Sequence, residues 1–150
     1  MSQPNGGFGY FGKSGSGHFI KMAHNAIEYG ILQVLGEGFW LLKESEFKSD
    51  LKEVAGLWNK GSIVRSYLLE ALENVFSNKK SFDEISGYIG GGSTGGWAVA
   101  EANKLGVPMP LIESACLERV RSHSKESFAD RVVAALRHEF GGHRIVKREA

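Results

Sequence analysis

The chain has 150 residues, a length typical of one domain that buries its core without metals or crosslinks. Its formal net charge is +1, and its basic residues are mixed with acidic ones, which indicates that nucleic acid is not a partner. Because the sequence shows no signal peptide, no apolar run of about 20 residues and a single cysteine, Cys116, we expect a soluble cytoplasmic protein without membrane contact.

The first segment, residues 1–15, is predicted to be a flexible tail or linker, because glycine, serine, proline and asparagine disfavour helix. An ordered domain is predicted over residues 16–150. Its first helix is predicted from His18 to Lys43, where apolar residues occupy most sides of the axis. This pattern is typical of a helix buried in a bundle.

Two shorter helices and a loop are predicted next. The first helix is predicted over residues 50–58. Ser62 is expected to cap a second helix, which runs to Phe76. The glycine-rich stretch from Gly87 to Gly96 is predicted to be a loop. Such a loop either lies beside a ligand or is simply a flexible turn, and its composition does not decide between them.

Three further helices are predicted over residues 97–105, 110–121 and 124–140, with glycines as stop signals after the first and the last. No segment alternates apolar and polar residues as a half-buried strand does. The sequence therefore predicts an all-α fold, a multi-helix bundle around one long buried N-terminal helix. Without strands, a nucleotide-binding βαβ unit cannot be built.

Two motif matches are rejected on their context. Gly7 to Ser14 matches a phosphate-binding P-loop, but a P-loop follows a buried strand, and only short, mostly polar sequence precedes Gly7. His138 and His143 resemble a helical zinc motif, but their five-residue spacing puts them on different faces of a helix. We therefore expect no metal site here and interpret these residues as the end of a helix.

A polar strip on the first long helix is the strongest functional signal. Lys21, His24, Asn25 and Glu28 recur at three- and four-residue steps, with Tyr29 at their margin. Burying such groups is unfavourable unless they bind one another or line a polar cavity. The strip therefore indicates either a ligand cavity or a structural polar network, and composition alone does not choose between them.

The segment from Gly15 to Gly30 resembles, nearly residue for residue, the segment that opens the helical domain of 6-phosphogluconate dehydrogenases. The wider β-hydroxyacid dehydrogenase superfamily would require only the glycine turn, the lysine and the asparagine, whereas His24 and Ile27-Glu28-Tyr29 point to the narrower family. Two later segments agree with it. They are Gly95-Gly96-Trp97 followed by Gly106-Val107-Pro108, and the closing stretch from Arg137 to His143.

The resemblance implies a role for each residue of the strip. Lys21 would be the base that takes the proton of the substrate 3-hydroxyl and later protonates the ketone, because a partly desolvated lysine is basic near neutral pH. Glu28 would protonate carbon 1 of the enediol. The substrate would be bound by His24 and Asn25 at its carboxylate and hydroxyls, and by Tyr29, Arg137 and His143 at its phosphate, the last two reaching a neighbouring subunit's site.

The resemblance also implies a homodimer and an NAD or NADP cofactor held by a separate dinucleotide-binding domain, whose glycine-rich fingerprint is absent from this sequence. Two phosphate-binding positions of the family, a lysine and a threonine, are here Gly96 and Ala98. The prediction is a substrate-binding and acid-base domain for 6-phosphogluconate. The alternatives are a related domain for an unphosphorylated sugar acid and a non-catalytic helical dimerisation module.

Overall fold

The computed structural model describes residues 7–148, and their regular structure is helical. Strand pairing within this range is limited to one isolated antiparallel bridge, between Ile85 and Lys147. The all-α prediction is therefore confirmed. The helices are α1 (Ser16–Glu44), α2 (Leu51–Asn59), α3 (Tyr67–Ser77), α4 (Lys79–Asp83), α5 (Thr94–Leu105), α6 (Pro110–Arg121) and α7 (Phe128–Gly141).

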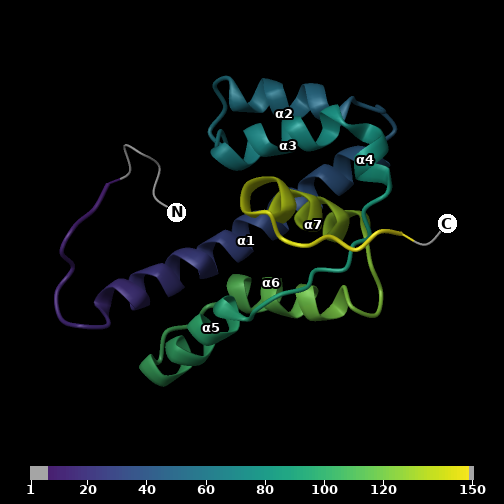
Figure 1. Ribbon diagram of the computed structural model, residues 1–150. Coiled ribbons are helices and arrows are strands. Elements are labelled where there is room, and N and C mark those ends of the chain that lie inside the picture. Colours follow the sequence, from purple (N-terminus) through teal and green to yellow (C-terminus); the bar gives the residue numbers. More distant parts are fainter. Residues whose placement is uncertain (1–6, 149–150) are drawn as a thin grey trace.

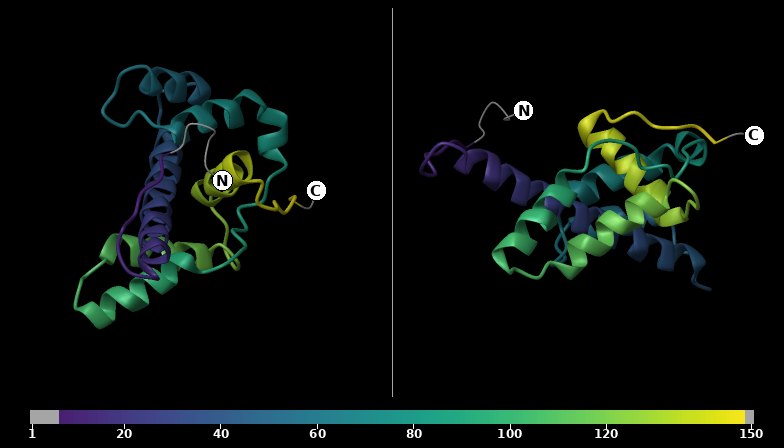
Figure 2. Two further views of the ribbon diagram at one scale, coloured as in Figure 1. Left: turned by 60° about the vertical axis from the view of Figure 1, so that its left-hand side comes forward. Right: turned by 90° about the horizontal axis from the view of Figure 1, so that it is seen from below.

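Helix α1 is the axis of the molecule (Figure 1). The α2–α3 pair lies towards the C-terminal half of α1, α5 and α6 lie along its other side, and α7 crosses it between these two groups. The first turns of α1 project from the bundle together with residues 7–15 (Figure 2). None of the helices in residues 7–148 combines the length and the apolar character that a bilayer span requires.

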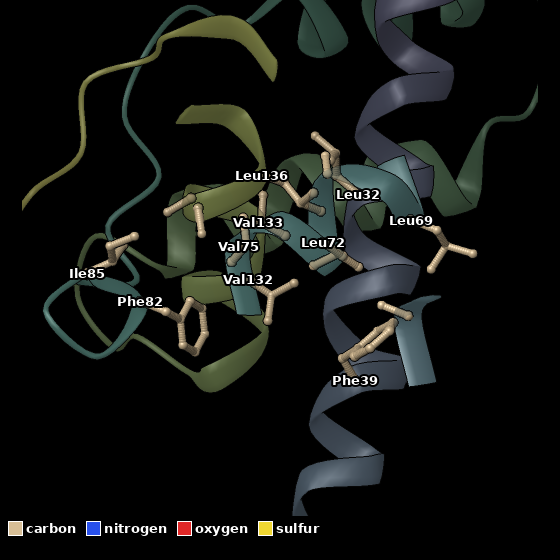
Figure 3. Close-up of a cluster of buried hydrophobic side chains, with 14 of the residues drawn as sticks. Leu32, Phe39, Leu69, Leu72, Val75, Phe82, Ile85, Val132, Val133 and Leu136 are labelled. Carbon is tan, nitrogen blue, oxygen red and sulfur yellow. The ribbon is translucent and has the colours of Figure 1, made fainter. Parts of the chain in front are cut away.

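The core lies where α1, α3 and α7 meet (Figure 3). Leu32 and Phe39 of α1 are fully buried, and each such apolar side chain contributes about 1.5–3 kcal/mol relative to an exposed one. The side chains from the other two helices that surround them are Leu69, Leu72, Val132, Val133 and Leu136.

Only part of α1 is buried within this chain. Its buried face carries Ala26, Tyr29, Leu32, Gln33, Gly36 and Phe39. Its apolar residues Ile27 and Val34 are 57% and 61% exposed. We expected α1 to be buried on most sides, but only one of its faces is buried within this chain. A second apolar face, which carries Ile27 and Val34, remains exposed.

The predicted start of the helix that follows α2 was wrong. The Ser62 hydroxyl donates a hydrogen bond back to the Trp58 carbonyl (2.7 Å), so Ser62 closes α2 instead of opening α3. Ser66 is the actual N-cap, and its hydroxyl accepts a hydrogen bond from the Leu69 amide. A serine three or four residues after a helix can serve either end, and the packing of Leu69 in the core selects this one.

Two other boundaries also differ from the prediction. Helix α7 begins at Phe128, not Ser124, because Ser127 and Asp130 form a capping box. Helix α5 begins at Thr94, so Gly95 lies in its first turn and not in the predicted loop. The short α4 was not predicted at all.

Candidate active site on helix α1

The polar strip of α1 is a connected set of side chains. Lys21 Nζ lies 3.3 Å from His24 Nδ1, which lies 3.1 Å from Asn25 Oδ1. One imidazole nitrogen can accept a hydrogen bond from the ammonium or donate one to the amide oxygen, but not both at once. The position of the proton on His24 therefore determines whether it holds Lys21 or Asn25.

The strip borders two grooves, whereas the cavity interpretation of the sequence would place its residues around one. Lys21 lines a groove of about 700 Å³ between α1 and α5, opposite Trp97. His24 and Glu28 line a more apolar groove of about 720 Å³ that is closed by side chains of α3 and α7. Lys21 and Glu28 are separated by about 10.5 Å along the helix axis, so different neighbouring helices flank them.

Lys21 is exposed in this chain. The partial desolvation that would make it a base near neutral pH therefore has to come from a bound ligand or from another protein surface. Asn25 and Glu28, one and two turns further along α1, are half-buried. The strip thus becomes progressively more buried towards Tyr29.

The three predicted phosphate-binding residues lie at or beside the loop between α4 and α5. The Tyr29 hydroxyl donates a hydrogen bond to the Gly92 carbonyl (2.8 Å), and Arg137 Nη1 donates one to the Gly90 carbonyl (2.6 Å). Arg137 Nη2 lies 3.5 Å from His143 Nδ1. The glycine-rich loop therefore contacts Tyr29 and Arg137, which come from distant parts of the sequence, and Arg137 in turn lies beside His143.

Arg119, which was not among the predicted site residues, belongs to the same cluster. Its Cζ lies 3.1 Å from the centroid of the Tyr29 ring, and the residue is 9% exposed. Its Nη2 is buried without a hydrogen-bond partner in the described part of the chain. A signal was present in the sequence, because Ala115 and Ser122 lie at helical spacing on either side of Arg119 and share its buried face.

The cluster carries a surplus of positive charge. The ion-paired arginines of residues 7–148 are Arg121, Arg131 and Arg148, so Arg119 and Arg137 lack a carboxylate within 4.0 Å. Burial lowers the pKa of Arg119 to about 10, and burial also lowers the pKa of Arg137. Two buried guanidinium groups without a counter-ion suit an anion that has several oxygen atoms.

His143 extends this positive cluster towards solvent. Burial, reinforced by the Arg137 charge, lowers the pKa of the His143 imidazole, and the Glu28 carboxylate partly opposes this effect. His143 follows α7 directly, and its amide donates a hydrogen bond to the Arg137 carbonyl (3.3 Å). Its position is therefore coupled to that of Arg137.

Glycines allow the surrounding backbone to approach the cluster closely. A Cβ atom on Gly95 would lie 2.6 Å from Tyr29 Cδ2 and 3.0 Å from Cys116 Sγ. Gly91 has a φ of +103°, and a Cβ atom there would lie 2.9 Å from Arg137 Nη2. Of the two interpretations of the glycine loop, the structure therefore favours a specific position beside a candidate ligand site.

The two family positions that differ in this chain lie in α5. Gly96 packs beside the Ser93 hydroxyl, in the space where a longer side chain would begin. Ala98 is 4% exposed and offers no polar group. Neither position supplies a side-chain donor for an anion, in contrast to the arginines and the Tyr29 hydroxyl of the cluster.

The fold and the site together define a class of protein, an all-helical domain with an ionisable strip beside a buried cationic cluster. Within that class, the chain matches the family model "6-phosphogluconate dehydrogenase, C-terminal domain" over residues 17–147. The chain therefore belongs to the 6-phosphogluconate dehydrogenase C-terminal domain family, as its resemblance to that family indicated.

Curated relatives agree with this assignment. The chain is 42% identical over 144 residues to the NAD(+)-dependent, decarboxylating 6-phosphogluconate dehydrogenase of Haloferax volcanii, with 95% of this chain and 48% of the relative covered. It is 43% identical over 142 residues to the putative 6-phosphogluconate dehydrogenase YqeC of Bacillus subtilis, with the same coverage.

A third relative uses the other nicotinamide cofactor. The NADP(+)-dependent, decarboxylating 6-phosphogluconate dehydrogenase of Bacillus subtilis is 38% identical over 125 residues, which cover 78% of this chain and 26% of that protein. The chain spans about half the length of the Haloferax and YqeC relatives. It therefore corresponds to one part of proteins of that kind.

Proposed function

We propose that this chain is the substrate-binding and acid-base domain of an oxidoreductase that converts 6-phosphogluconate to ribulose 5-phosphate and carbon dioxide. The observation that carries the proposal is the ionisable strip of α1, Lys21 to Glu28, which leads into the cationic cluster around Tyr29. A sugar acid with a phosphate at one end and a carboxylate at the other has the matching chemistry. The names of the relatives support the same substrate.

The cluster would bind the phosphate. Arg119 and Arg137 provide charge-assisted donors, Tyr29 provides a hydroxyl, and His143 adds a donor at the exposed edge. His24 and Asn25 would hold the carboxylate and hydroxyls, because an imidazole and an amide present donors and acceptors to both groups. The phosphate thus fixes one end of the substrate, and the strip aligns the rest along α1.

Lys21 and Glu28 would move the protons. Lys21 takes the proton of the 3-hydroxyl as that carbon is oxidised, and returns it to the ketone oxygen as the carboxylate leaves as carbon dioxide. The electrons of the broken carbon–carbon bond form an enediol. Glu28 then delivers a proton to carbon 1 of that enediol, while Lys21 takes back the proton of the carbon-2 hydroxyl, which yields the ketose.

The described residues do not fit a dinucleotide. Residues 7–148 have no parallel sheet and no strand that leads into a glycine-rich turn, which a nicotinamide dinucleotide site requires. We therefore assign NAD or NADP to a separate dinucleotide-binding domain. There the cofactor would accept the hydride, and the present chain would hold the sugar acid.

A second copy of the chain is the partner that we propose for the uncovered face of α1. Ile20, Ile27, Ile31, Val34 and Leu41 are between 40% and 74% exposed. They follow helical spacing over most of the length of α1, so they form one continuous apolar stripe. A self-complementary stripe of this kind suits a two-fold homodimer.

Gly96 and Ala98 favour a second candidate, a related domain for an unphosphorylated sugar acid, because both remove polar side chains from the phosphate end. Calorimetric titration of the chain with 6-phosphogluconate and with gluconate distinguishes the two. Tighter binding of the phosphorylated acid supports our proposal, whereas a preference for gluconate supports the second candidate. If neither ligand binds, the remaining candidate is a non-catalytic helical dimerisation module.

A further inference from the structure

A basic pocket of about 410 Å³ lies at the C-terminal end of α1, beside α4 (Figure 1). Four lysines border it, from α1, the turn after α1, α2 and α4: Lys43, Lys48, Lys52 and Lys79. Lys43 lies about 21 Å beyond Tyr29 along the axis of α1. The basic pocket is therefore separate from the cationic cluster, and it shares no residue with the two grooves beside the ionisable strip.

The inner wall of the basic pocket is aromatic. The ring centroids of Phe76 and Phe82 lie 5.3 Å apart, and those of Phe82 and Phe128 lie 5.6 Å apart, with an interplanar angle of 74° in both pairs. Phe82 is buried, whereas Phe76 and Phe128 are half-buried and border the opening. An aromatic group of a ligand can extend this chain of edge-to-face contacts, which is the arrangement that aromatic rings favour.

Two carboxylates also border the basic pocket, but both have other partners. The Asp50 side chain is the N-cap of α2, and it accepts hydrogen bonds from the backbone amides of residues 52 and 53 (2.9 and 3.2 Å). The Asp83 carboxylate lies 3.4 Å from Arg131 Nη2. Neither carboxylate forms an ion pair with a lysine of the pocket in the described part of the chain.

The lysines therefore give the rim of the basic pocket a surplus of positive charge. Lys43 is paired with Glu44, at 2.9 Å. Among residues 7–148, the other three, Lys48, Lys52 and Lys79, have no carboxylate within 4.0 Å. A concave site with charges of one sign at its rim concentrates ions of the opposite sign, so the basic pocket attracts anions.

Lys48 occupies its place at the rim in an unfavourable backbone conformation. Its φ is +49°, and it is the one non-glycine residue with a positive φ in residues 7–148. Glycine adopts this left-handed conformation without the steric cost that a side chain adds. The lysine therefore stands where glycine would fit the backbone better, and the residue that does stand there contributes a charge to the pocket.

We propose that the basic pocket binds an aromatic phosphate, a small molecule that combines an aromatic ring with a phosphate group. The ring contacts the phenylalanine wall, and the phosphate lies among the ammonium groups of Lys48, Lys52 and Lys79. A dianion suits several separate lysines, because each acts on phosphate as a point charge. The volume lies within the range of about 300–1,000 Å³ that small-molecule sites occupy.

This proposal does not rest on the proposed function. 6-Phosphogluconate has no aromatic group, and the residues assigned to it lie elsewhere on the chain. A failure of either proposal therefore leaves the other standing, because the two concern different sites and different ligands.

Phenyl phosphate is the probe, and amide NMR spectra of the full chain locate its site. We expect shift changes at residues 48–52 and 79–83, and an affinity about 10-fold or more above that of inorganic phosphate, because the ring buries apolar surface. Benzyl alcohol keeps the ring without the charge and should also bind more weakly. Shift changes confined to the residues around Tyr29, or an affinity for either control equal to that for phenyl phosphate, would overturn the proposal.

Two neighbouring lysines of α4 test the role of the rim charge. Lys79→Met should weaken phenyl phosphate binding about 5-fold, the effect of losing one exposed charge partner. Lys80→Met is the matched control, because Lys80 is also exposed but does not border the pocket. Its affinity should stay that of the wild type. Equal losses in the two variants would show general attraction of anions to the surface and would overturn the proposal.

Lys48→Gly separates binding from folding. The melting temperature should stay the same or rise, because glycine suits the positive φ, while phenyl phosphate binding should weaken with the loss of the charge. Binding of phenyl phosphate to Lys48→Gly with wild-type affinity would overturn the proposal.

Discussion

The guanidinium of Arg119 lies over the ring of Tyr29, with Cζ 3.1 Å from the ring centroid. Because the flat face of the guanidinium lies on the ring, the N–H groups at its edge can still bind a ligand. Arg119→Met should weaken 6-phosphogluconate binding about 10-fold to 150-fold, because a charge-assisted hydrogen bond contributes about 1.5–3 kcal/mol. Calorimetric titration measures this change.

Gluconate is the control ligand for that substitution, and its affinity should not change. An equal loss for both ligands would place Arg119 away from the phosphate. The melting temperature of Arg119→Met should stay the same or rise, because the substitution removes a buried charge that has no carboxylate partner.

Gly95→Ala should disturb the cluster through Tyr29. The added Cβ atom would lie 2.6 Å from Tyr29 Cδ2, so the ring must shift, and overpacking of this kind costs about 1–3 kcal/mol. We expect a lower melting temperature and weaker ligand binding. Gly92→Ala is the matched control, because a Cβ atom there meets nothing within 4 Å. Equal effects of the two substitutions would contradict the close packing of α5 on Tyr29.

His143 should make stability depend on pH. Burial and the Arg137 charge lower its pKa in the folded state, so the unfolded chain binds more protons between that pKa and the ordinary value of 6.5. Stability should therefore fall as the pH decreases through 6.5 towards the folded-state pKa. Thermal melts of wild type and His143→Asn across this window measure the effect. The melting temperature of the variant should change less with pH than that of the wild type. Identical changes in the two proteins would show that His143 is not the cause.

The role of Lys21 can be tested once a dinucleotide domain is supplied. Joining the dinucleotide half of a relative ahead of Ser16 should give a protein that reduces its cofactor with 6-phosphogluconate, whereas the chain alone should not turn over. Lys21→Met in the joined protein should abolish turnover, because methionine keeps much of the length without the base. Spectrophotometry at the nicotinamide absorbance measures both. Turnover that survives the substitution would refute the proton-transfer role of Lys21.

The exposed stripe of α1 predicts self-association. The double substitution Ile27→Glu with Val34→Glu places charges on two residues that are 57% and 61% exposed, so the fold should persist while the dimer is lost. Light scattering at micromolar concentration measures the mass. Leu57→Glu on α2 is the control, because Leu57 is an equally exposed apolar residue away from the stripe. A monomeric wild type would contradict the prediction.

Sequence periodicity was sufficient for the helical fold and for the strip of α1, because both follow from three- and four-residue spacing. It was not sufficient for the start of α3, because Ser62 and Ser66 are both possible caps and only the packing of Leu69 selects between them. The short α4 lacks a periodic apolar pattern long enough to be recognised.

The site was predicted less completely than the fold. Arg119 was missed because an arginine near the end of a helix usually faces solvent, and its burial depends on where α6 packs against Tyr29. The split between the Lys21 and Glu28 grooves was missed for a related reason. Spacing on one helix fixes which residues share a face, but the neighbouring helices determine which cavity each residue lines.

The hydrogen bonds of the glycine loop have a consequence for ligand selectivity. Because the Tyr29 hydroxyl and Arg137 Nη1 already donate to the Gly92 and Gly90 carbonyls, a ligand that uses these two donors must compete with the protein's own backbone for them. A chloride or a simple monocarboxylate offers too few acceptors to replace both bonds, whereas a phosphate monoester offers three terminal oxygens. We therefore expect small monovalent anions to compete poorly with the loop carbonyls for these two donors.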